Sequence, residues 1–370
     1  MTHKAESILI IEPYYGGSHK SFLAGLQFVL DRPCTLLTLP AKKWKTRMHL
    51  AAPHMAGQII DLYAGGKRYA GLFTSSFLDV AVLRSLLAQA GILLPIGLYF
   101  HENQFAYPSQ RDAGAQYSYA AINFLSALCA DAIAFNSKHN RDTFFQGVKG
   151  YLRKNKEFNL AQRVEQLYAS SVILHPGMAF EPSHGSEKKC NRTPVIVWNH
   201  RWEHDKNPEQ FFTALFSLAE RQVPFHLIVL GQSFRNIPAI FDQAREVLGS
   251  RMLHFGFVSS RQQYLALLQQ GSVVVSTARH EFFGYSVLEA VRAGCRPLVP
   301  DRLAYPELFP GEFRYGSGRF ENELEHVLRR NIRLSQECSR ALTEPYLWNN
   351  VAGEYRQWFQ EWIASKQPVP

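Results

Sequence analysis

Short apolar runs rich in branched residues alternate with longer segments of mixed polarity along the first half of the chain. The apolar runs cover residues 7–11, 35–39, 97–100, 132–135 and 171–174. Helix-length segments separate them. Such alternation is typical of a parallel β-sheet covered by helices. The first half of the sequence therefore predicts a doubly wound α/β domain.

The pattern stops at a polar stretch and then restarts. Residues 181–194 are rich in charged and turn-forming residues, as interdomain linkers are. Five further β-rich runs follow, at residues 195–198, 225–230, 252–257, 272–276 and 297–299. We therefore expect two Rossmann-like domains, 1–185 and 194–345. Aromatic and aliphatic residues at helical spacing over 347–366 predict a last helix that rejoins the first domain.

The composition is that of a protein folded nearly throughout. The chain has 370 residues, too many for one hydrophobic core, and 46% of them are hydrophobic. No apolar run reaches the roughly 18 residues of a membrane-spanning helix. Glu6 stands where a secretory signal has its apolar region. The five cysteines are scattered and lack Cys-x-x-Cys spacing, which argues against a disulfide framework or a zinc site. We expect a cytoplasmic protein.

The first strand ends in Glu-Pro-Tyr-Tyr-Gly-Gly-Ser-His, residues 12–19. The adjacent Gly16 and Gly17 let a backbone approach a phosphate closely, and Ser18 can cap the following helix. Any tight turn from strand to helix also uses such glycines. The motif is therefore compatible both with an anion site and with a purely structural turn.

Four polar residues follow the apolar strand 97–100, namely His101, Glu102, Asn103 and Gln104. Ligands of doubly wound sheets bind beyond the carboxyl ends of the strands. A lone histidine is more often structural, but four hydrogen-bonding side chains together favour contact with a ligand.

A densely polar segment opens the second domain directly after its first strand. It leads into a helix whose start is predicted at residues 207–208, with asparagine as the cap and proline in the first turn. Arg201 and Lys206 are two cations suited to a diphosphate leaving group, whose negative charge grows as the bond to a sugar breaks. The alternative is that they pair with Glu203 and Asp205.

Two glutamates flank a glycine in the segment 280–294. Glu281 falls in a loop after the strand 272–276, Gly284 permits close backbone approach, and Glu289 lies early in the next helix. A carboxylate accepts hydrogen bonds from paired hydroxyls, so Glu281 suits the transferred sugar and Glu289 the ribose of a donor. Glutamates at this spacing also occur by chance.

These residues carry a resemblance. The cations, the spacing from Glu281 to Glu289 and the following Gly294 are similar to the donor site of retaining GT-B glycosyltransferases of family four. That fold has two Rossmann-like domains facing across a cleft. The segments EPYYGGSHK, YFHENQ, AFNSKHNR, WNHRWEHDKNPE and HEFFG resemble, in this order, the tRNA-queuosine alpha-mannosyltransferases over almost the full length.

The resemblance implies transfer of mannose from GDP-mannose to the cyclopentenediol of queuosine at the wobble position of tRNA-Asp, with retention of configuration. It assigns catalysis to His101, Arg201, Lys206 and Glu281. The implied donor-binding residues are Gly16, Gly17, Asn199, Arg201, Lys206, Glu281, Phe282, Phe283, Gly284 and Glu289. No Asp-x-Asp motif is present, so we expect no metal and no other cofactor.

The net charge of +9 fits an anionic acceptor, although charge runs are commonly solvated surfaces. Basic residues of the first domain suit an RNA backbone, and Trp44 among them suits an exposed base. The expected acceptor residues are Ser18, His19, Lys42, Lys43, Trp44, Lys45, Arg47, Glu102, Asn103, Gln104, Lys138 and Arg141. Two alternatives remain: a related enzyme acting on an anionic lipid or glycan, and a non-catalytic RNA-binding relative.

Overall fold

The chain forms two compact units, the first made of residues 1–179 and 346–370 and the second of residues 180–345. The computed structural model describes residues 7–107, 113–155, 157–180, 193–233 and 237–364. Most of the expected linker 181–194 lies outside the described residues. Within the described ranges, no helix is long and apolar enough to span a bilayer.

Six parallel strands form the sheet of the first unit, in the order β2-β1-β3-β4-β5-β6. They are β1 Ile8–Tyr15, β2 Cys34–Pro40, β3 Gly71–Ser75, β4 Ile96–Phe100, β5 Ala132–Phe135 and β6 Val172–Ile173. Alternate side chains of each central strand enter different apolar cores. Leu9 and Ile11 of β1 join one core, whereas Ile8 and Ile10 join the other. A sheet buried on both faces explains why its strands read as continuous apolar runs.

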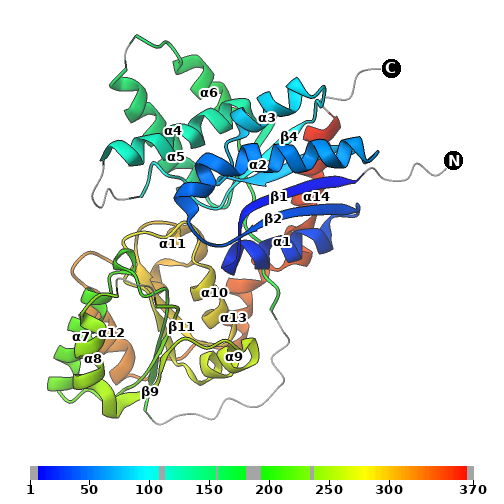
Figure 1. Ribbon diagram of the computed structural model, residues 1–370. Helices are drawn as coiled ribbons and strands as arrows, with labels where there is room; N and C mark the ends of the chain where they lie inside the picture. The colour runs from blue at the N-terminus through cyan, green and yellow to red at the C-terminus, as the bar shows by residue number, and fades with distance from the viewer. Residues whose placement is uncertain (1–6, 108–112, 156, 181–192, 234–236, 365–370) are drawn as a thin grey trace. The chain divides into compact units, whose positions relative to one another are not determined.

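Helices cover both faces of this sheet. They are α1 Gly17–Val29, α2 Trp44–Ala64, α3 Val80–Gln89, α4 Ala113–Cys129, α5 Lys138–Arg153, α6 Ala161–Ser170 and α14 Trp348–Ala364. Residues of α2 to α6 contribute to one core, and residues of α1 and α14 to the other (Figure 1). The C-terminal segment thus returns to the first unit, where five aromatic residues of α14 help to build the core.

Glycine residues on α1, β3 and β4 make room for the tryptophans of α14. A Cβ atom on Gly25 would lie 1.8 Å from Nε1 of Trp348. Cβ atoms on Gly71 and Gly97 would lie 2.6 Å and 2.9 Å from the ring of Trp362. Because such contacts are closer than atoms can approach, glycine at these positions is a packing requirement.

We expect Gly25→Ala to destabilise the protein by about 1–3 kcal/mol because Trp348 must shift. Helix propensity alone predicts the opposite, a gain of about 1 kcal/mol. The matched control is Gly57→Ala on α2, where a new Cβ meets nothing within 4 Å. That variant should be stabilised by about 0.5–1 kcal/mol. Urea unfolding followed by circular dichroism measures both, and a Gly25→Ala protein as stable as the wild type would contradict the packing argument.

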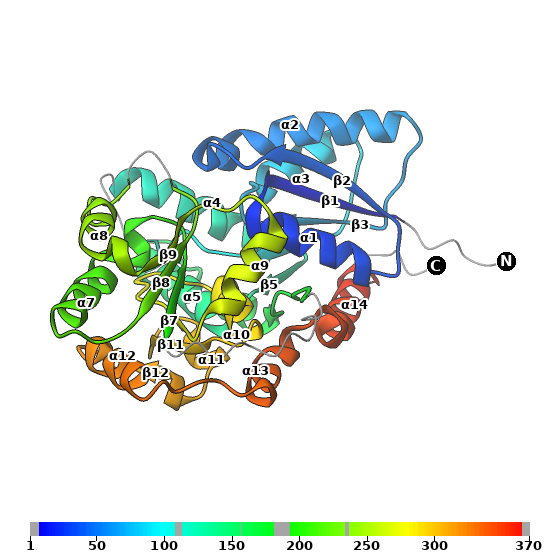
Figure 2. The same ribbon diagram turned by 90° about the horizontal axis from the view of Figure 1, so that it is seen from below.

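The second unit is also built on six parallel strands, in the order β12-β11-β10-β7-β8-β9. They are β7 Val195–Asn199, β8 His226–Leu230, β9 Met252–Gly256, β10 Val273–Val275, β11 Arg296–Pro300 and β12 Arg314–Tyr315. Its helices are α7 Pro208–Glu220, α8 Ile240–Leu248, α9 Arg261–Gln270, α10 Tyr285–Arg292, α11 Tyr305–Leu308, α12 Phe320–Arg329 and α13 Gln336–Thr343. Helices α7, α8 and α12 pack in its main core, and Figure 2 shows α9 and α10 on the other side of the strands from α7 and α8.

The expected doubly wound α/β architecture is confirmed, and each predicted run coincides with a strand to within a few residues. Two strands were not predicted. β3 lies between β1 and β4, but Thr74 and Ser75 at its end are polar and only Gly71, Leu72 and Phe73 precede them. β12 is two residues long. The apolar run of β3 and the whole of β12 are too short for their hydrophobicity to separate them from a loop.

Candidate active site

Lys206 and Glu281 meet in the second unit although 75 residues separate them. Lys206 ends the 3₁₀ helix His204–Lys206 after β7, and Glu281 follows β10. Because β7 and β10 are neighbouring parallel strands, their carboxyl ends bring the two loops together. The Lys206 Nζ lies 3.2 Å from Oε2 of Glu281 and donates a hydrogen bond of 2.7 Å to the carbonyl of His280.

The environment keeps this buried pair charged. Burial alone would lower the pKa of Lys206, but Glu281 and Asp205 outweigh it and raise that pKa. Burial alone would likewise raise the pKa of Glu281, but Lys206 and neighbouring hydrogen bonds lower it to about 2. Burial, followed by the charge of Lys206, lowers the pKa of His200 to about 4. The site at neutral pH therefore holds an ammonium ion, a carboxylate and a neutral imidazole.

The carboxylates next to the two cations take part in ion pairs, as the less favoured interpretation of the sequence proposed. Arg201 lies 3.2 Å from Glu203, and both side chains are substantially exposed. Lys206 lies 3.3 Å from Asp205, and both of these are largely buried. Pairing with Glu203 does not prevent Arg201 from binding a ligand, because an exposed ion pair contributes little to stability.

The loop from Glu281 to Gly284 folds back on the Glu281 carboxylate. Its Oε1 accepts hydrogen bonds from the backbone N–H groups of Phe283, at 3.4 Å, and Gly284, at 3.1 Å. Gly284 starts α10 with a φ of 107°, a conformation that favours glycine. The side chains of Phe282 and Phe283 are buried, so these two predicted donor-binding residues offer a ligand mainly their backbone.

Glu289 lies in α10 and belongs to a second polar group, two members of which were not predicted from the sequence. Its carboxylate pairs with Arg261 at 2.6 Å and accepts a hydrogen bond from Tyr264 at 2.9 Å. The predicted Asn199 joins this group by donating to the hydroxyl of Tyr264, at 3.1 Å, and to the carbonyl of Ser286, at 2.7 Å. Arg261 and Tyr264 belong to α9, and no local pattern marked them as partners of Glu289.

The caps of the two site helices differ from prediction. Asn207 precedes Pro208 at the start of α7 as expected, but its side chain makes no capping hydrogen bond and donates to Gln210 instead. Helix α1 begins at Gly17 with Gly16 at the cap position, so Ser18 lies inside the first turn and is not the cap. A Cβ on Gly16 would lie 2.5 Å from that of Ala41, which gives this glycine a structural role as well.

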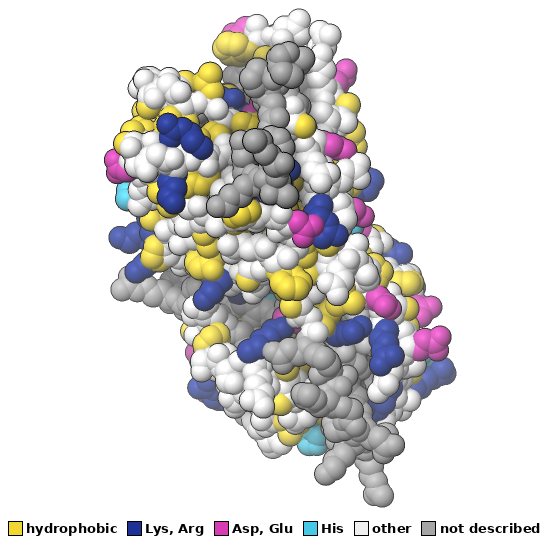
Figure 3. Space-filling model, turned by 90° about the vertical axis from the view of Figure 1, so that its right-hand side faces the viewer, with side chains coloured by type: hydrophobic (Ala, Val, Ile, Leu, Met, Phe, Trp, Pro, Cys, Tyr) yellow, Lys and Arg dark blue, Asp and Glu magenta, His cyan; other side chains and the backbone are white. Residues whose placement is uncertain are grey.

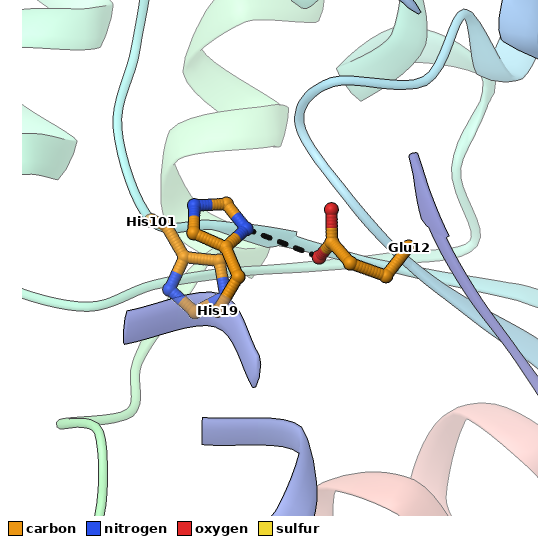
Figure 4. Close-up of side chains that lie close together, drawn as sticks. All are labelled: Glu12, His19 and His101. Atoms are coloured by element: carbon orange, nitrogen blue, oxygen red, sulfur yellow. Dashed lines mark hydrogen bonds and ion pairs between the residues drawn. The ribbon is translucent and has the colours of Figure 1, made fainter. Parts of the chain in front are cut away.

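In the first unit, Glu12, His19 and His101 lie close together (Figure 4). Glu12 is on β1, His19 is on the first turns of α1, and His101 directly follows β4. The Glu12 carboxylate lies 3.1 Å from Nδ1 of His19 and also accepts a hydrogen bond of 3.0 Å from Ser75 at the end of β3. Glu12 opens the segment EPYYGGSHK but was not among the predicted site residues, because nothing in the local sequence indicates that it faces His19.

The imidazole of His101 is neutral at physiological pH. Burial, and then the proximity of His19, lower the pKa of His101 well below its usual value. The two imidazole ring centroids lie 4.1 Å apart. Phe22 and Tyr99 each meet the His101 ring edge to face at 4.7 Å. A neutral imidazole can accept a hydrogen bond from a hydroxyl group, as the predicted role requires.

The other residues of the 101–104 segment mainly hold the loop in place. Asn103 is fully buried, and its amide nitrogen donates to Asn140 and Thr143 while its oxygen accepts from the Ala106 N–H. Both ends of the Asn103 amide thus have partners inside the protein, and its contact with an acceptor stays a prediction. The Gln104 side chain is also buried, whereas Glu102 is partly exposed and its carbonyl accepts from Ser76.

Basic residues predicted to contact RNA surround the start of α2. Lys42, Lys43 and Lys45 are exposed, while Arg47 and Trp44 are partly buried. Trp44 packs against Phe77 and Tyr119, with ring centroids 6.2 Å and 5.2 Å away. Its ring is therefore already in a cluster, and an exposed base could stack only on the part that remains accessible.

The second predicted basic group belongs to α5 and is partly neutralised. Lys138 forms an ion pair with Asp142, and this hydrogen bond raises the pKa of the Lys138 amine. Arg141 lies over the ring of Tyr168 at 4.7 Å and 3.6 Å from Asp142. On the face of the molecule in Figure 3, Lys and Arg side chains are spread among other residues and do not form one continuous patch.

Comparison with known families matches both units. Residues 7–178 match the family described as "tRNA-queuosine alpha-mannosyltransferase N-terminal", and residues 180–312 match "Glycosyl transferases group 1". The second match includes the Lys206–Glu281 pair. The chain is therefore a glycosyltransferase.

Solved structures that resemble the chain share its fold at low sequence identity. The catalytic domain of starch synthase IV from Arabidopsis thaliana has a TM-score of 0.72 and 10% identity, covering 97% of this chain and 100% of that chain. Sucrose-phosphate synthase from Thermosynechococcus elongatus has a TM-score of 0.68 and 15% identity, covering 98% and 100%. These likenesses, together with the two parallel sheets, confirm the GT-B fold class.

Two curated relatives bear on the family. A GDP-mannose-dependent alpha-(1-6)-phosphatidylinositol dimannoside mannosyltransferase from Mycobacterium tuberculosis is 24% identical over 205 residues, about half of each chain. The tRNA-queuosine alpha-mannosyltransferase of Drosophila melanogaster is 37% identical over 323 residues, which cover 84% of this chain and 83% of the relative. With this identity over most of both lengths, the chain belongs to the tRNA-queuosine alpha-mannosyltransferase family.

Proposed function

We propose that this glycosyltransferase moves mannose from GDP-mannose to the cyclopentenediol of queuosine in the anticodon of tRNA-Asp. Family membership supports the acceptor class. The observation that carries the transfer chemistry is the buried, charged Lys206–Glu281 pair at the carboxyl ends of β7 and β10. This is the edge of a doubly wound sheet at which such folds bind their ligands.

In this proposal the protein supplies the positive charge that the leaving diphosphate needs. The bond between the mannose anomeric carbon and the β-phosphate oxygen breaks, and its electron pair stays on GDP. Lys206 and Arg201 stabilise that growing negative charge more in the transition state than in the ground state. The acceptor hydroxyl attacks from the same face, so configuration is retained, and its proton passes to the departing phosphate. We propose that no metal ion is required.

The remaining donor contacts follow from the chemistry of the residues. Glu281 accepts hydrogen bonds from hydroxyls of the transferred mannose, and Glu289 accepts from the ribose of GDP. The buried hydrogen bonds of both carboxylates support this assignment because they hold the oxygens in place before the donor binds. The backbone at Gly16 and Gly17 approaches the diphosphate.

For the acceptor, we propose that His101 lies against the sugar or the diol and that exposed basic residues of the first unit contact the RNA backbone. Their contribution is nonspecific attraction, which weakens as the salt concentration rises. The exposed lysines of this group are Lys42, Lys43, Lys45 and Lys138. An RNA acceptor is in keeping with a cytoplasmic location.

One finding favours a second acceptor class. The M. tuberculosis relative is named for a phosphatidylinositol dimannoside acceptor, an anionic lipid. Its name also contains GDP-mannose, which supports the proposed donor. Its identity of 24% over about half of the chain is much weaker support than the queuosine relative provides. We therefore rank a lipid acceptor second.

The deciding experiment is nucleoside mass spectrometry on total tRNA incubated with the enzyme and GDP-mannose. One sample comes from cells that make queuosine and a matched sample from cells that lack it. We expect one hexose to be added only to queuosine, only in tRNA-Asp and equally well in EDTA. Phosphatidylinositol mannosides and other sugar nucleotides serve as competing substrates. If the enzyme slowly hydrolyses GDP-mannose but no nucleoside gains a sugar from any donor, the tRNA assignment is wrong.

A further inference from the structure

We propose that Glu12 is a positioning residue for the transfer reaction: its carboxylate fixes the tautomer of His19 and, through the contact between the two imidazole rings, the orientation of His101. The inference rests on the proposed function, in which His101 lies against the sugar or the acceptor. It assigns a role to a residue that was not among the predicted site residues and that acts through His19, not on a substrate.

The two carboxylate oxygens of Glu12 have different partners. Oε1 accepts hydrogen bonds from the Tyr14 N–H at 2.8 Å and from the Ser75 hydroxyl at 3.0 Å. Oε2 faces Nδ1 of His19 at 3.1 Å (Figure 4). Glu12 is 1% exposed, so water cannot replace a lost partner. The carboxylate is therefore held in one orientation by β1 and β3, with one oxygen directed at His19.

A carboxylate can only accept hydrogen bonds, so Nδ1 of His19 must carry the proton that they share. In the neutral ring, the other nitrogen, Nε2, is then the acceptor. Buried carboxylates that orient histidines in this way are a recurrent device in catalytic and metal sites. Here the carboxylate decides both the protonation pattern of His19 and the plane of its ring.

His19 transmits this constraint to His101. The planes of the two rings are tilted by 38°, with centroids 4.1 Å apart. Phe22 and Tyr99 confine His101 on other sides, each at 4.7 Å, and the backbone carbonyl of His101 accepts from Asn136 at 2.7 Å. Because His19 is one wall of this enclosure, a change in its position or charge alters both the position and the protonation of His101.

The test is Glu12→Gln, which keeps the shape of the side chain. The amide oxygen can still accept from Tyr14 and Ser75, but the amide nitrogen then donates toward Nδ1 of His19. Nδ1 must become the acceptor, and the ring proton moves to Nε2. We expect kcat to fall on the order of 10²-fold, the penalty typical of a misplaced reacting group, with the KM for GDP-mannose unchanged within about threefold.

Nitrogen-15 NMR on histidine-labelled protein reads the tautomer directly. We expect His19 with Nδ1–H in the wild type and Nε2–H in Glu12→Gln. The His19 signal is assigned by its loss in His19→Asn. The matched control is Asp131→Asn, another isosteric loss of a buried carboxylate, which accepts from the Ile96 N–H at the other end of the same sheet. It should keep wild-type kcat.

Three results would overturn the inference. One is a Glu12→Gln enzyme with kcat within threefold of the wild type. Another is a wild-type His19 that carries its proton on Nε2. The third is a stoichiometric metal ion whose removal lowers activity. Ligand atoms of Glu12, His19 and His101 lie within 4.8 Å of one another, so a metal bound there would replace the hydrogen bond on which the inference rests. If the wild type transfers no mannose to queuosine, the proposed function fails. The tautomer of His19 and the rate at which Glu12→Gln hydrolyses GDP-mannose then still decide the role of Glu12.

Discussion

Replacing Lys206 with methionine is expected to lower kcat by about 10²–10³-fold, the usual cost of removing one group that stabilises transition-state charge. Methionine fills a similar volume but brings no charge to the diphosphate. The same change leaves the Glu281 carboxylate buried without its cation, 3.2 Å away in the wild type. Removing one partner of a buried pair costs about 3–5 kcal/mol of stability. Steady-state kinetics and urea unfolding measure the two effects separately.

A double variant distinguishes catalysis from folding. Adding Glu281→Gln to Lys206→Met removes the uncompensated charge, so much of the lost stability should return. Activity should remain low, because the cation is still absent. Arg201→Met serves as the matched control for charge: it removes an exposed cation of the same loop, whose side chain is 50% exposed, and should not destabilise the fold. A Lys206→Met enzyme with nearly normal kcat would disprove the proposed role of Lys206.

Acidification from about pH 6.5 to pH 4 is expected to weaken the fold by roughly 3 kcal/mol through His200 alone. Its pKa falls from 6.5 to about 4 in the folded protein, because burial and Lys206 disfavour the imidazolium ion. The unfolded chain therefore binds the proton first as the pH drops. Stability that is fully present above about pH 6.5 is lost as the pH approaches 4.

Urea unfolding at several pH values tests this dependence. His200→Gln should flatten the slope between pH 6.5 and 4, whereas His204→Gln, at a side chain that is 57% exposed, should leave it unchanged. Glu281 governs a lower range. Its folded pKa of about 2 lies below 4.5, so its contribution is present above pH 4.5 and is lost as the pH falls to about 2. A wild-type stability that is constant from pH 7 to 4 would contradict the assignment of His200.

Much of the architecture follows from local sequence. Runs such as residues 195–198 are apolar throughout because both faces of a parallel sheet are buried, and this property is visible without knowing any neighbour. Polar residues that directly follow such runs, including Lys206 and Glu281, fall at the ligand-binding edge of the sheet. The family resemblance followed from the same segments. The sequence by itself thus determined the fold class, the family and the principal cations and carboxylates of the proposed donor site.

Tertiary structure alone decided the partners of these groups. Glu12, His19 and His101 converge because β1, β3 and β4 are adjacent, an order that includes a strand, β3, that was not predicted. Arg261 reaches Glu289 only through the packing of α9 against α10. Asn103 is buried, whereas Glu102 directly before it is partly exposed. Strand order and side-chain direction depend on contacts between residues far apart in the chain, which no local pattern encodes.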